Sequence, residues 1–203
     1  ARLVFKDVRV PRENIVGRLH GAYDVFNTMM VPERLGTAAM TIGAAQPALE
    51  IATGYTARRK AFGRKINQFQ GVSFQVAEAA MLLDASRAMV YQTASLVDAD
   101  SPARFVRRQV SETKKFVTES CQKAAHHAMQ VMGGIGYTDI FPIVCIVRDL
   151  RLASIWTGTN EIMAAIIANE WYREYARRDG SRQYREVALD AAGALDHDEK
   201  VYE

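Results

Sequence analysis

Hydrophobic residues recur at intervals of three and four along most of this chain, which is the spacing of one face of an α-helix. The spacing predicts helices over residues 23–58, 70–99, 103–132, 143–153 and 159–177. The stripe within residues 103–132 is the clearest, and its members are Val106, Val110, Val117, Cys121, Ala124, Ala128 and Val131. Long helices joined by short loops pack antiparallel. The pattern therefore predicts an all-α fold, an up-and-down bundle of the four-helix type.

Two prolines fall inside the first of these helical patterns. Pro32 and Pro47 both lie within residues 23–58. A proline in a helix interior lacks the N–H group that the helix needs, and it costs ~3 kcal/mol. We therefore expect a break or a kink near each proline.

The first residues follow a different pattern. Within residues 2–17, charged residues separate the hydrophobic side chains of Leu3, Phe5, Val8 and Val10. This alternation predicts one or two β-strands at the N-terminus. Two strands cannot bury a face by themselves, so we expect another chain, a twofold mate or a further segment to complete their sheet.

Composition restricts the class of protein. Of the 203 residues, 49% are hydrophobic, which is enough for a substantial core. The net charge of +3 comes from 26 basic and 23 acidic residues. The basic residues are spread along the chain, so we expect no nucleic-acid-binding surface. The densest basic patch, Arg58–Lys60 with Arg64 and Lys65, has a size that suits one phosphorylated small molecule.

Other features favour a soluble protein of a reducing compartment. The two cysteines, Cys121 and Cys145, lack metal-ligand spacing, and both are expected in the core. No apolar run reaches membrane-spanning length, and no signal peptide leads the chain. His126 and His127 are adjacent on a predicted helix and point about 100° apart, so they cannot hold one metal ion together. We expect no metal site.

Two glycine-containing stretches, Met129–Tyr137 and Ile155–Ile162, stand at the ends of predicted helices. Backbone without bulky side chains lets an extended ligand approach the peptide groups closely. The run Gly133–Gly136 lacks the strand-then-helix context of a dinucleotide fingerprint, and the sequence shows neither a phosphate loop nor a Ser-His-Asp set. These stretches are therefore candidate ligand-binding segments whose ligand the glycines alone do not define.

Five blocks of the sequence resemble the acyl-CoA dehydrogenase family in order and spacing. The blocks are Phe5–Pro11, Arg59–Gly63 with Gln70, Gln130–Tyr137, Arg148–Asp149 and Gly158–Ile162. The similarity covers about residues 3–175 and corresponds to the C-terminal half of the family's fold. It implies three parts: residues 1–20 end the middle β-domain, residues 21–178 form the C-terminal helical bundle, and residues 179–203 form a tail or arm. The N-terminal half is then expected elsewhere, in the same or another chain.

The resemblance implies that the chain binds FAD. Arg59 and Gln70 stand where the family reaches the adenosine diphosphate part of an FAD held mainly by a neighbouring subunit, and a guanidinium suits phosphate. Gln130 and the Gly133–Gly134 backbone look like a second contact to the same FAD. A further contact is implied in the helical turn after Gly158, where free amides favour an anion. The implied cofactor contacts are Arg59, Phe62, Gln70, Gln130, Gly133, Gly134, Thr159, Asn160 and Glu161.

The resemblance also implies α,β-desaturation of an acyl-CoA thioester, in which a carboxylate removes the α-proton and hydride leaves for flavin N5. In most members the base is the glutamate directly before the Gly-Thr pair, but this sequence has Thr157 there. A branch that resembles the isovaleryl-CoA and long-chain enzymes places the base in a Glu-Arg-Leu triplet on the first long helix, and this sequence has Glu33-Arg34-Leu35. We therefore expect Glu33 to act as the base in a largely dry pocket. The residues expected at the substrate are Arg34, Thr157 and Gly158.

Two alternatives stay open at the level of the sequence. An acyl-CoA oxidase shares much of this bundle and passes electrons to oxygen, and a non-catalytic assembly subunit would explain the loss of the usual base at Thr157. The leading interpretation is an acyl-CoA dehydrogenase, or its C-terminal part, that passes electrons to an electron-transferring flavoprotein. The family's usual arrangement implies a homodimer or homotetramer in a bacterial cytoplasm or in the mitochondrial matrix.

Overall fold

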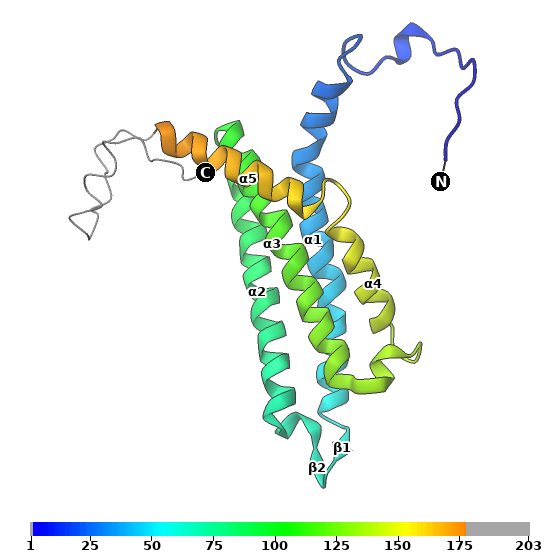
Figure 1. Cartoon of the computed structure of the whole chain (residues 1–203), viewed down its shortest axis with the longest axis vertical. Coiled ribbons are helices and arrows are strands. Elements are labelled where there is room, and N and C mark those ends of the chain that lie inside the picture. The colour runs from blue at the N-terminus through cyan, green and yellow to red at the C-terminus, as the bar shows by residue number, and fades with distance from the viewer. Residues whose placement is uncertain (1, 178–203) are drawn as a thin grey trace, which may run out of the picture. The chain divides into compact units, whose positions relative to one another are not determined.

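A computed structural model describes residues 2–177, which contain five α-helices and one two-stranded sheet (Figure 1). The chain divides into two compact units, residues 1–170 and residues 171–203. The helices are α1 (Ala22–Thr56), α2 (Gln70–Asp98), α3 (Ala103–Met132), α4 (Ile143–Ala153) and α5 (Asn160–Arg177), and the 3-10 helices are η1 (Arg12–Asn14), η2 (Ile66–Gln68) and η3 (Gly133–Tyr137). The predicted all-α bundle with a short strand segment is confirmed. The predicted tail over residues 179–203 lies outside the described residues.

The long helix α1 continues through both of its prolines. We expected a break or a kink at each proline, and neither Pro32 nor Pro47 breaks the helix. Each proline leaves one carbonyl without its helical hydrogen bond, and this cost is local. Buried side chains flank both positions, namely Met30 and Arg34 around Pro32 and Ala48 directly after Pro47. Packing on both sides of each proline therefore offsets the lost hydrogen bond.

The core of the bundle forms around α3, which contacts α1, α2 and α4 (Figure 1). Every residue of the predicted α3 stripe is buried. Many of the core residues of α1 and α3 are alanines, and these small side chains allow the two helices to approach closely. They are Ala38, Ala45, Ala48, Ala52, Ala124, Ala125 and Ala128.

The two cysteines have different environments. Cys121 is fully buried, and burial raises the pKa of its thiol to about 12. Cys145 is exposed, so the expectation that it lies in the core is wrong. The buried face of α4 is formed by Ile143, Leu150 and Ala153. Because two residues along a helix correspond to about 200°, position 145 lies on the face opposite Ile143.

The strands lie in a different place from the one that the sequence predicts. β1 (Lys60–Ala61) and β2 (Arg64–Lys65) pair antiparallel around Phe62 and Gly63, whose φ angles of 50° and 80° suit a two-residue hairpin turn. Residues 2–17 contain no strand, and η1 is their only regular element. A strand needs a neighbour for its backbone hydrogen bonds, and within residues 2–177 no segment provides one for this stretch. The hydrophobic side chains of the stretch are accordingly exposed.

Two further findings concern the described part of the chain. Within residues 2–177, no helix combines the length and the hydropathy needed to cross a membrane. The same residues contain no cluster of three or more His, Cys, Asp or Glu side chains that could bind a metal ion.

Candidate functional site

A loop of unusual backbone conformation joins α4 to α5. Its residues Thr157 and Gly158 have φ angles of 54° and 98°, in the left-handed region. A β-branched residue is strained there, and such strain persists only where the surrounding contacts hold it. A Cβ atom at position 158 would lie 2.9 Å from Met163 Cε and 3.4 Å from Arg34 Nη2. A side chain at this position would therefore be strained by the backbone conformation and would press on Met163 and Arg34.

Two buried cations hold the carbonyl groups of this loop, and we call this pair of residues the carbonyl clamp. On α1, Arg34 Nε donates a hydrogen bond to the Thr157 carbonyl oxygen at 3.1 Å. On α3, Lys114 Nζ donates a hydrogen bond to the Gly158 carbonyl oxygen at 2.9 Å. Arg34 is 9% exposed and Lys114 is fully buried. Hydrogen bonds from charged donors are about twice as strong as neutral ones, so the clamp fixes both peptide groups.

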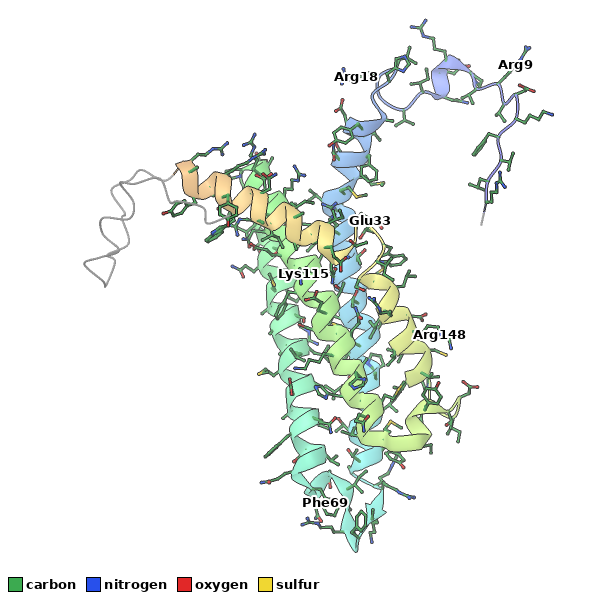
Figure 2. All side chains as sticks on the ribbon, viewed as in Figure 1. Arg9, Arg18, Glu33, Phe69, Lys115 and Arg148 are labelled. Atoms are coloured by element: carbon green, nitrogen blue, oxygen red, sulfur yellow. The ribbon has the colours of Figure 1, made fainter. Side chains whose placement is uncertain are left out.

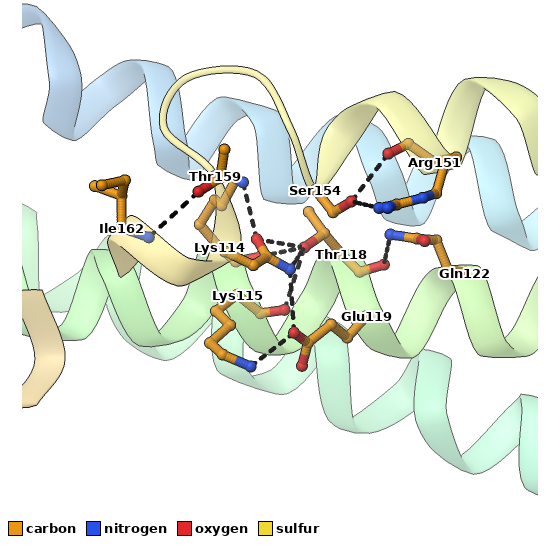
Figure 3. A network of polar contacts seen from close by, with 10 residues as sticks. Lys114, Lys115, Thr118, Glu119, Gln122, Arg151, Ser154, Thr159 and Ile162 are labelled. Carbon is orange, nitrogen blue, oxygen red and sulfur yellow. Dashed lines mark hydrogen bonds and ion pairs between the residues drawn. The ribbon is translucent and has the colours of Figure 1, made fainter. Parts of the chain in front are cut away.

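Asn160 connects Lys114 of the clamp to the acidic side chain of Glu119. Lys114, Thr118 and Glu119 lie together in this polar network (Figure 3). Its Oδ1 accepts a hydrogen bond from Lys114 Nζ at 2.9 Å, and its Nδ2 donates to Glu119 Oε1 at 3.2 Å and to Thr118 Oγ1 at 3.1 Å. Glu119 also forms an ion pair with Lys115 at 2.6 Å. The amide oxygen of Asn160 therefore faces a cation and the amide nitrogen faces a carboxylate. These charges give the amide a single favourable orientation.

Burial and repulsion from neighbouring cations lower the pKa values of both clamp residues. Burial is the largest cause that lowers the pKa of Lys114 from 10.5 to about 8, and repulsion from Arg34 adds to it. Glu161 and Glu119 oppose this shift. The pKa of Arg34 is lowered by burial and then by Arg107. Within residues 2–177, the hydrogen-bond acceptors of the two clamp residues are neutral, namely two backbone carbonyls and the amide oxygen of Asn160.

Sequence reasoning assigned no role to Lys114, although its position in the helix is a signal. The residue follows Val110 by four positions and precedes Val117 by three, so it occupies a position within the apolar stripe of α3. A lysine in that register is either buried or extends along the helix to reach water. The structure shows the buried state.

Glu33, the expected base, directly precedes Arg34 on α1 and is exposed. Figure 2 shows it on the part of α1 that Arg34 joins to the α4–α5 loop. The dry surroundings expected for a base are therefore not supplied by the described residues of this chain. Thr157, which stands where most of the family has the base, has a buried hydroxyl with no hydrogen-bond partner within residues 2–177.

A second set of site residues lines a groove at the other end of α3, which we call the large groove. Its volume is ≈ 530 Å³, and four of the expected cofactor contacts line it, namely Arg59, Gln130, Gly133 and Gly134. They come from the segment after α1, from the end of α3 and from η3. An added Cβ on either glycine would meet no atom within 4 Å, so open space lies beside this backbone.

Phe62 and Gln70 do not line the large groove, and both are exposed. Phe62 is 95% exposed at the tip of the β1–β2 hairpin. Its φ of 50° is unusual for an aromatic residue. Its ring lies 6.2 Å from that of Phe69, and the guanidinium of Arg64 lies 3.9 Å from the centre of the Phe69 ring. The hairpin tip thus presents a large hydrophobic side chain to solvent.

The remaining expected cofactor contacts, Thr159, Asn160 and Glu161, lie together in a smaller groove of ≈ 150 Å³ at the start of α5. The pKa of the Glu161 carboxyl is lowered, first by its own backbone N–H, then by the Thr159 hydroxyl, and also by Arg151. The first turn of α5 therefore already carries one anion. Lys114, which binds Asn160, and Gln130, in the large groove, are separated along α3 by about 24 Å at the helical rise of 1.5 Å per residue.

Residues 20–171 match the family described as acyl-CoA dehydrogenase, C-terminal domain. The chain belongs to the acyl-CoA dehydrogenase family. It is 31% identical over 175 residues to the mitochondrial short-chain specific acyl-CoA dehydrogenase of Mus musculus, a match that covers 86% of this chain and 42% of that protein. It is 33% identical to the caffeyl-CoA reductase–Etf complex subunit CarC of Acetobacterium woodii, with 82% and 43% covered.

Solved structures of the family share the fold of this chain. The butyryl-CoA dehydrogenase of Megasphaera elsdenii has a TM-score of 0.78 and 30% sequence identity, and the match covers 84% of this chain and 44% of that one. This chain thus spans less than half the length of the relatives that it matches. The acyl-CoA dehydrogenase family consists of flavoprotein oxidoreductases of fatty acid metabolism, which is the class that the sequence motifs indicate.

Proposed function

We propose that this chain forms the C-terminal helical part of an FAD-dependent acyl-CoA dehydrogenase, which desaturates an acyl-CoA thioester between its α and β carbons. The observation that carries the proposal is the large groove, where four expected cofactor contacts from separate segments line one cavity. Membership of the family supports it. The activity is proposed for an assembly that contains the whole of the family's fold.

The large groove has the chemistry to bind the adenosine diphosphate part of FAD. Arg59 offers forked, permanently charged donors to phosphate, and the open backbone at Gly133 and Gly134 permits close approach. The groove volume of ≈ 530 Å³ lies within the usual range for small-molecule sites, about 300–1,000 Å³. Exposed Phe62 and Gln70 beside it would add contacts. We infer that this FAD is held mainly by a neighbouring subunit that contains the whole of the family's fold.

The residues at the start of α5 would contact a different FAD molecule. Thr159 and Glu161 line the smaller groove, which reaches Gln122 on α3, whereas the large groove reaches Gln130, about 12 Å further along the helix. In a homodimer, each copy would then contact its own cofactor near α5 and that of its partner at the large groove. In this arrangement, both sets of expected cofactor contacts would bind FAD.

Glu33 is proposed as the base that removes the α-proton. It stands next to Arg34, which binds the Thr157 carbonyl and so brings α1 to the loop where most of the family carries the base. Bound thioester and the rest of the fold would cover Glu33 and keep it dry, as a carboxylate base requires. FAD, when bound, supplies the acceptor for the hydride that leaves the β-carbon. Arg34, Thr157 and Gly158 would form the wall beside the thioester.

The proposed partners follow from the family. CarC of Acetobacterium woodii is a subunit of a complex with an electron-transferring flavoprotein, and we infer such a flavoprotein as electron acceptor here. A homodimer or homotetramer in a bacterial cytoplasm or in the mitochondrial matrix is the proposed setting.

Flavin reduction tests the proposed chemistry. An assembly with the whole fold should bleach its flavin on addition of a suitable acyl-CoA, and Glu33→Gln should lower the rate more than tenfold. Glu50→Gln, at an exposed glutamate later on α1, is the matched control and should leave the rate unchanged. Turnover of Glu33→Gln within tenfold of the unchanged protein would exclude Glu33 as the base. The chain of 203 residues alone is expected to retain FAD weakly or not at all.

The same assay separates the alternatives. Rapid formation of hydrogen peroxide by the reduced enzyme would indicate an acyl-CoA oxidase. A non-catalytic assembly subunit is favoured by two observations, the threonine at position 157 and the exposure of Glu33. Absence of flavin bleaching across short, branched, long and aromatic acyl-CoA compounds would support that role.

A further inference from the structure

The carbonyl clamp determines which way two peptide groups of the α4–α5 loop point. The Thr157 carbonyl turns toward Arg34 and the Gly158 carbonyl turns toward Lys114. In a trans peptide the C=O and the following N–H point in opposite directions. The N–H groups of Gly158 and Thr159 therefore point away from the two cations, and neither has a backbone acceptor within residues 2–177.

We propose that Lys114 is a positioning residue whose protonated ammonium group, together with Arg34, holds the loop in the conformation that presents these two N–H groups. Lys114 does not line any of the grooves of the site, so it acts through the loop and not on a ligand. That the loop serves catalysis rests on the proposed function. The clamp itself rests only on the contacts described above.

The positioning depends on the charge of Lys114. An ammonium group has three N–H donors and bonds both the Gly158 carbonyl and Asn160 Oδ1 with charge assistance. A neutral amine donates weaker bonds and has one donor fewer. The protonated form of Lys114 is disfavoured because the side chain is fully buried and because Arg34 on α1 repels it. Its pKa is therefore lowered to about 8.

Several charged groups around Lys114 set the pH at which the clamp weakens. On α5, Glu161 favours the protonated lysine, and on α3 itself Glu119 does the same. On α4, Arg151 interacts with Glu161, and on α3 Lys115 pairs with Glu119, so both carboxylates are already partly neutralised. The balance leaves Lys114 close to the point of losing its proton at mildly alkaline pH.

Trp156 provides a reporter that requires neither flavin nor substrate. It directly precedes Thr157 in the loop and is 44% exposed. These 203 residues contain two tryptophans, so Trp171→Phe leaves Trp156 as the single indole among them. We expect its fluorescence to show one titration step with a midpoint of about pH 8, as the loop relaxes when Lys114 loses its proton. Circular dichroism recorded in parallel should show that the helices stay folded through the step.

Three substitutions in the Trp171→Phe background test the assignment. Lys114→Met should remove the step. Asn160→Asp places a carboxylate beside the ammonium and should move the midpoint upward by about one pH unit or more. Lys123→Met, which removes an exposed lysine of α3 paired with Glu78, is the control and should keep the step unchanged.

Two results would overturn the proposal: a flat titration of the parent protein around pH 8, or a step that survives Lys114→Met. If Lys114→Met does not fold, Asn160→Asp decides, and an unmoved midpoint counts against the role of Lys114. A titration step in a protein whose flavin is not bleached by acyl-CoA would leave the clamp established and the proposed function refuted. Absence of the step from the parent protein, with flavin bleaching intact, would refute the role of the clamp and leave the proposed function standing.

Discussion

Replacing Gly158 with alanine tests whether contacts around the α4–α5 loop hold its backbone in the left-handed conformation. At a φ of 98°, a residue with a Cβ is strained by about 1–2 kcal/mol. The new Cβ would also lie 2.9 Å from Met163 Cε, in a fully buried side chain. Overpacking a core costs typically 1–3 kcal/mol, and the flexibility of methionine favours the low end. We therefore expect Gly158→Ala to lower the free energy of unfolding by about 2–3 kcal/mol.

The measurement is urea and thermal unfolding followed by the helical circular dichroism signal. For a chain of this size a loss of 1 kcal/mol lowers Tm by about 2–4 °C, so the expected shift is about 5–10 °C. Gly134→Ala is the matched control. Gly134 has no positive φ, and its added Cβ would meet nothing within 4 Å. It should therefore change the free energy of unfolding by less than about 0.5 kcal/mol.

A double-mutant cycle separates the two parts of the effect. Met163→Ala removes the side chain that the new Cβ would meet, so the combined variant should be more stable than the sum of the single effects predicts, by about 1 kcal/mol. The backbone strain should remain in the combined variant. If Gly158→Ala is no more destabilising than Gly134→Ala, the loop can relax freely and the argument that contacts hold it is wrong.

Other predictions concern the helices, the thiols and the pH dependence of stability. Gly54→Ala within α1, where an added Cβ meets nothing within 4 Å, should raise the free energy of unfolding by about 0.5–1 kcal/mol in urea titrations. A thiol reagent should modify exposed Cys145 at once and buried Cys121, with a pKa of about 12, only on unfolding; fast modification of both would contradict the core packing. Since the pKa of Lys114 falls from 10.5 to about 8 on folding, its burial lowers stability by about 3 kcal/mol at neutral pH. Between about pH 8 and 10.5, the free energy of unfolding of the unchanged protein should rise relative to that of Lys114→Met. Parallel pH curves for the two proteins would refute the lowered pKa of Lys114.

The helices could be predicted from the sequence because each has a long apolar periodicity that one fold satisfies. The pattern placed the third helix over residues 103–132, and α3 has the same bounds. Two local features misled the prediction. The penalty of a proline is local, whereas the packing of α1 on either side of Pro32 and Pro47 is not visible in the sequence. Alternation over residues 2–17 describes how a strand would face a sheet, but it does not supply the neighbouring strand.

Residues of the candidate site could be predicted from the sequence only where they belong to a family motif. Arg59, Gln130, Gly133 and Gly134 came from the family resemblance, and the structure brings them to one groove. Lys114 belongs to no such block, since its role depends on burial and on a loop 44 residues later in the chain. A lysine within an apolar stripe usually extends its side chain so that the ammonium group reaches water. The burial of Lys114 therefore could not be predicted from the sequence.

Arg34 joins the two positions at which a base is expected in this family. Its guanidinium is bound to the carbonyl of Thr157, where most members carry the carboxylate, and its neighbour on α1 is Glu33. Arg34 therefore links the loop position of the usual base to the helix that carries Glu33. The substitution at position 157 is thus compatible with an unchanged loop, because Arg34 and Lys114 hold its backbone and not the side chain at that position.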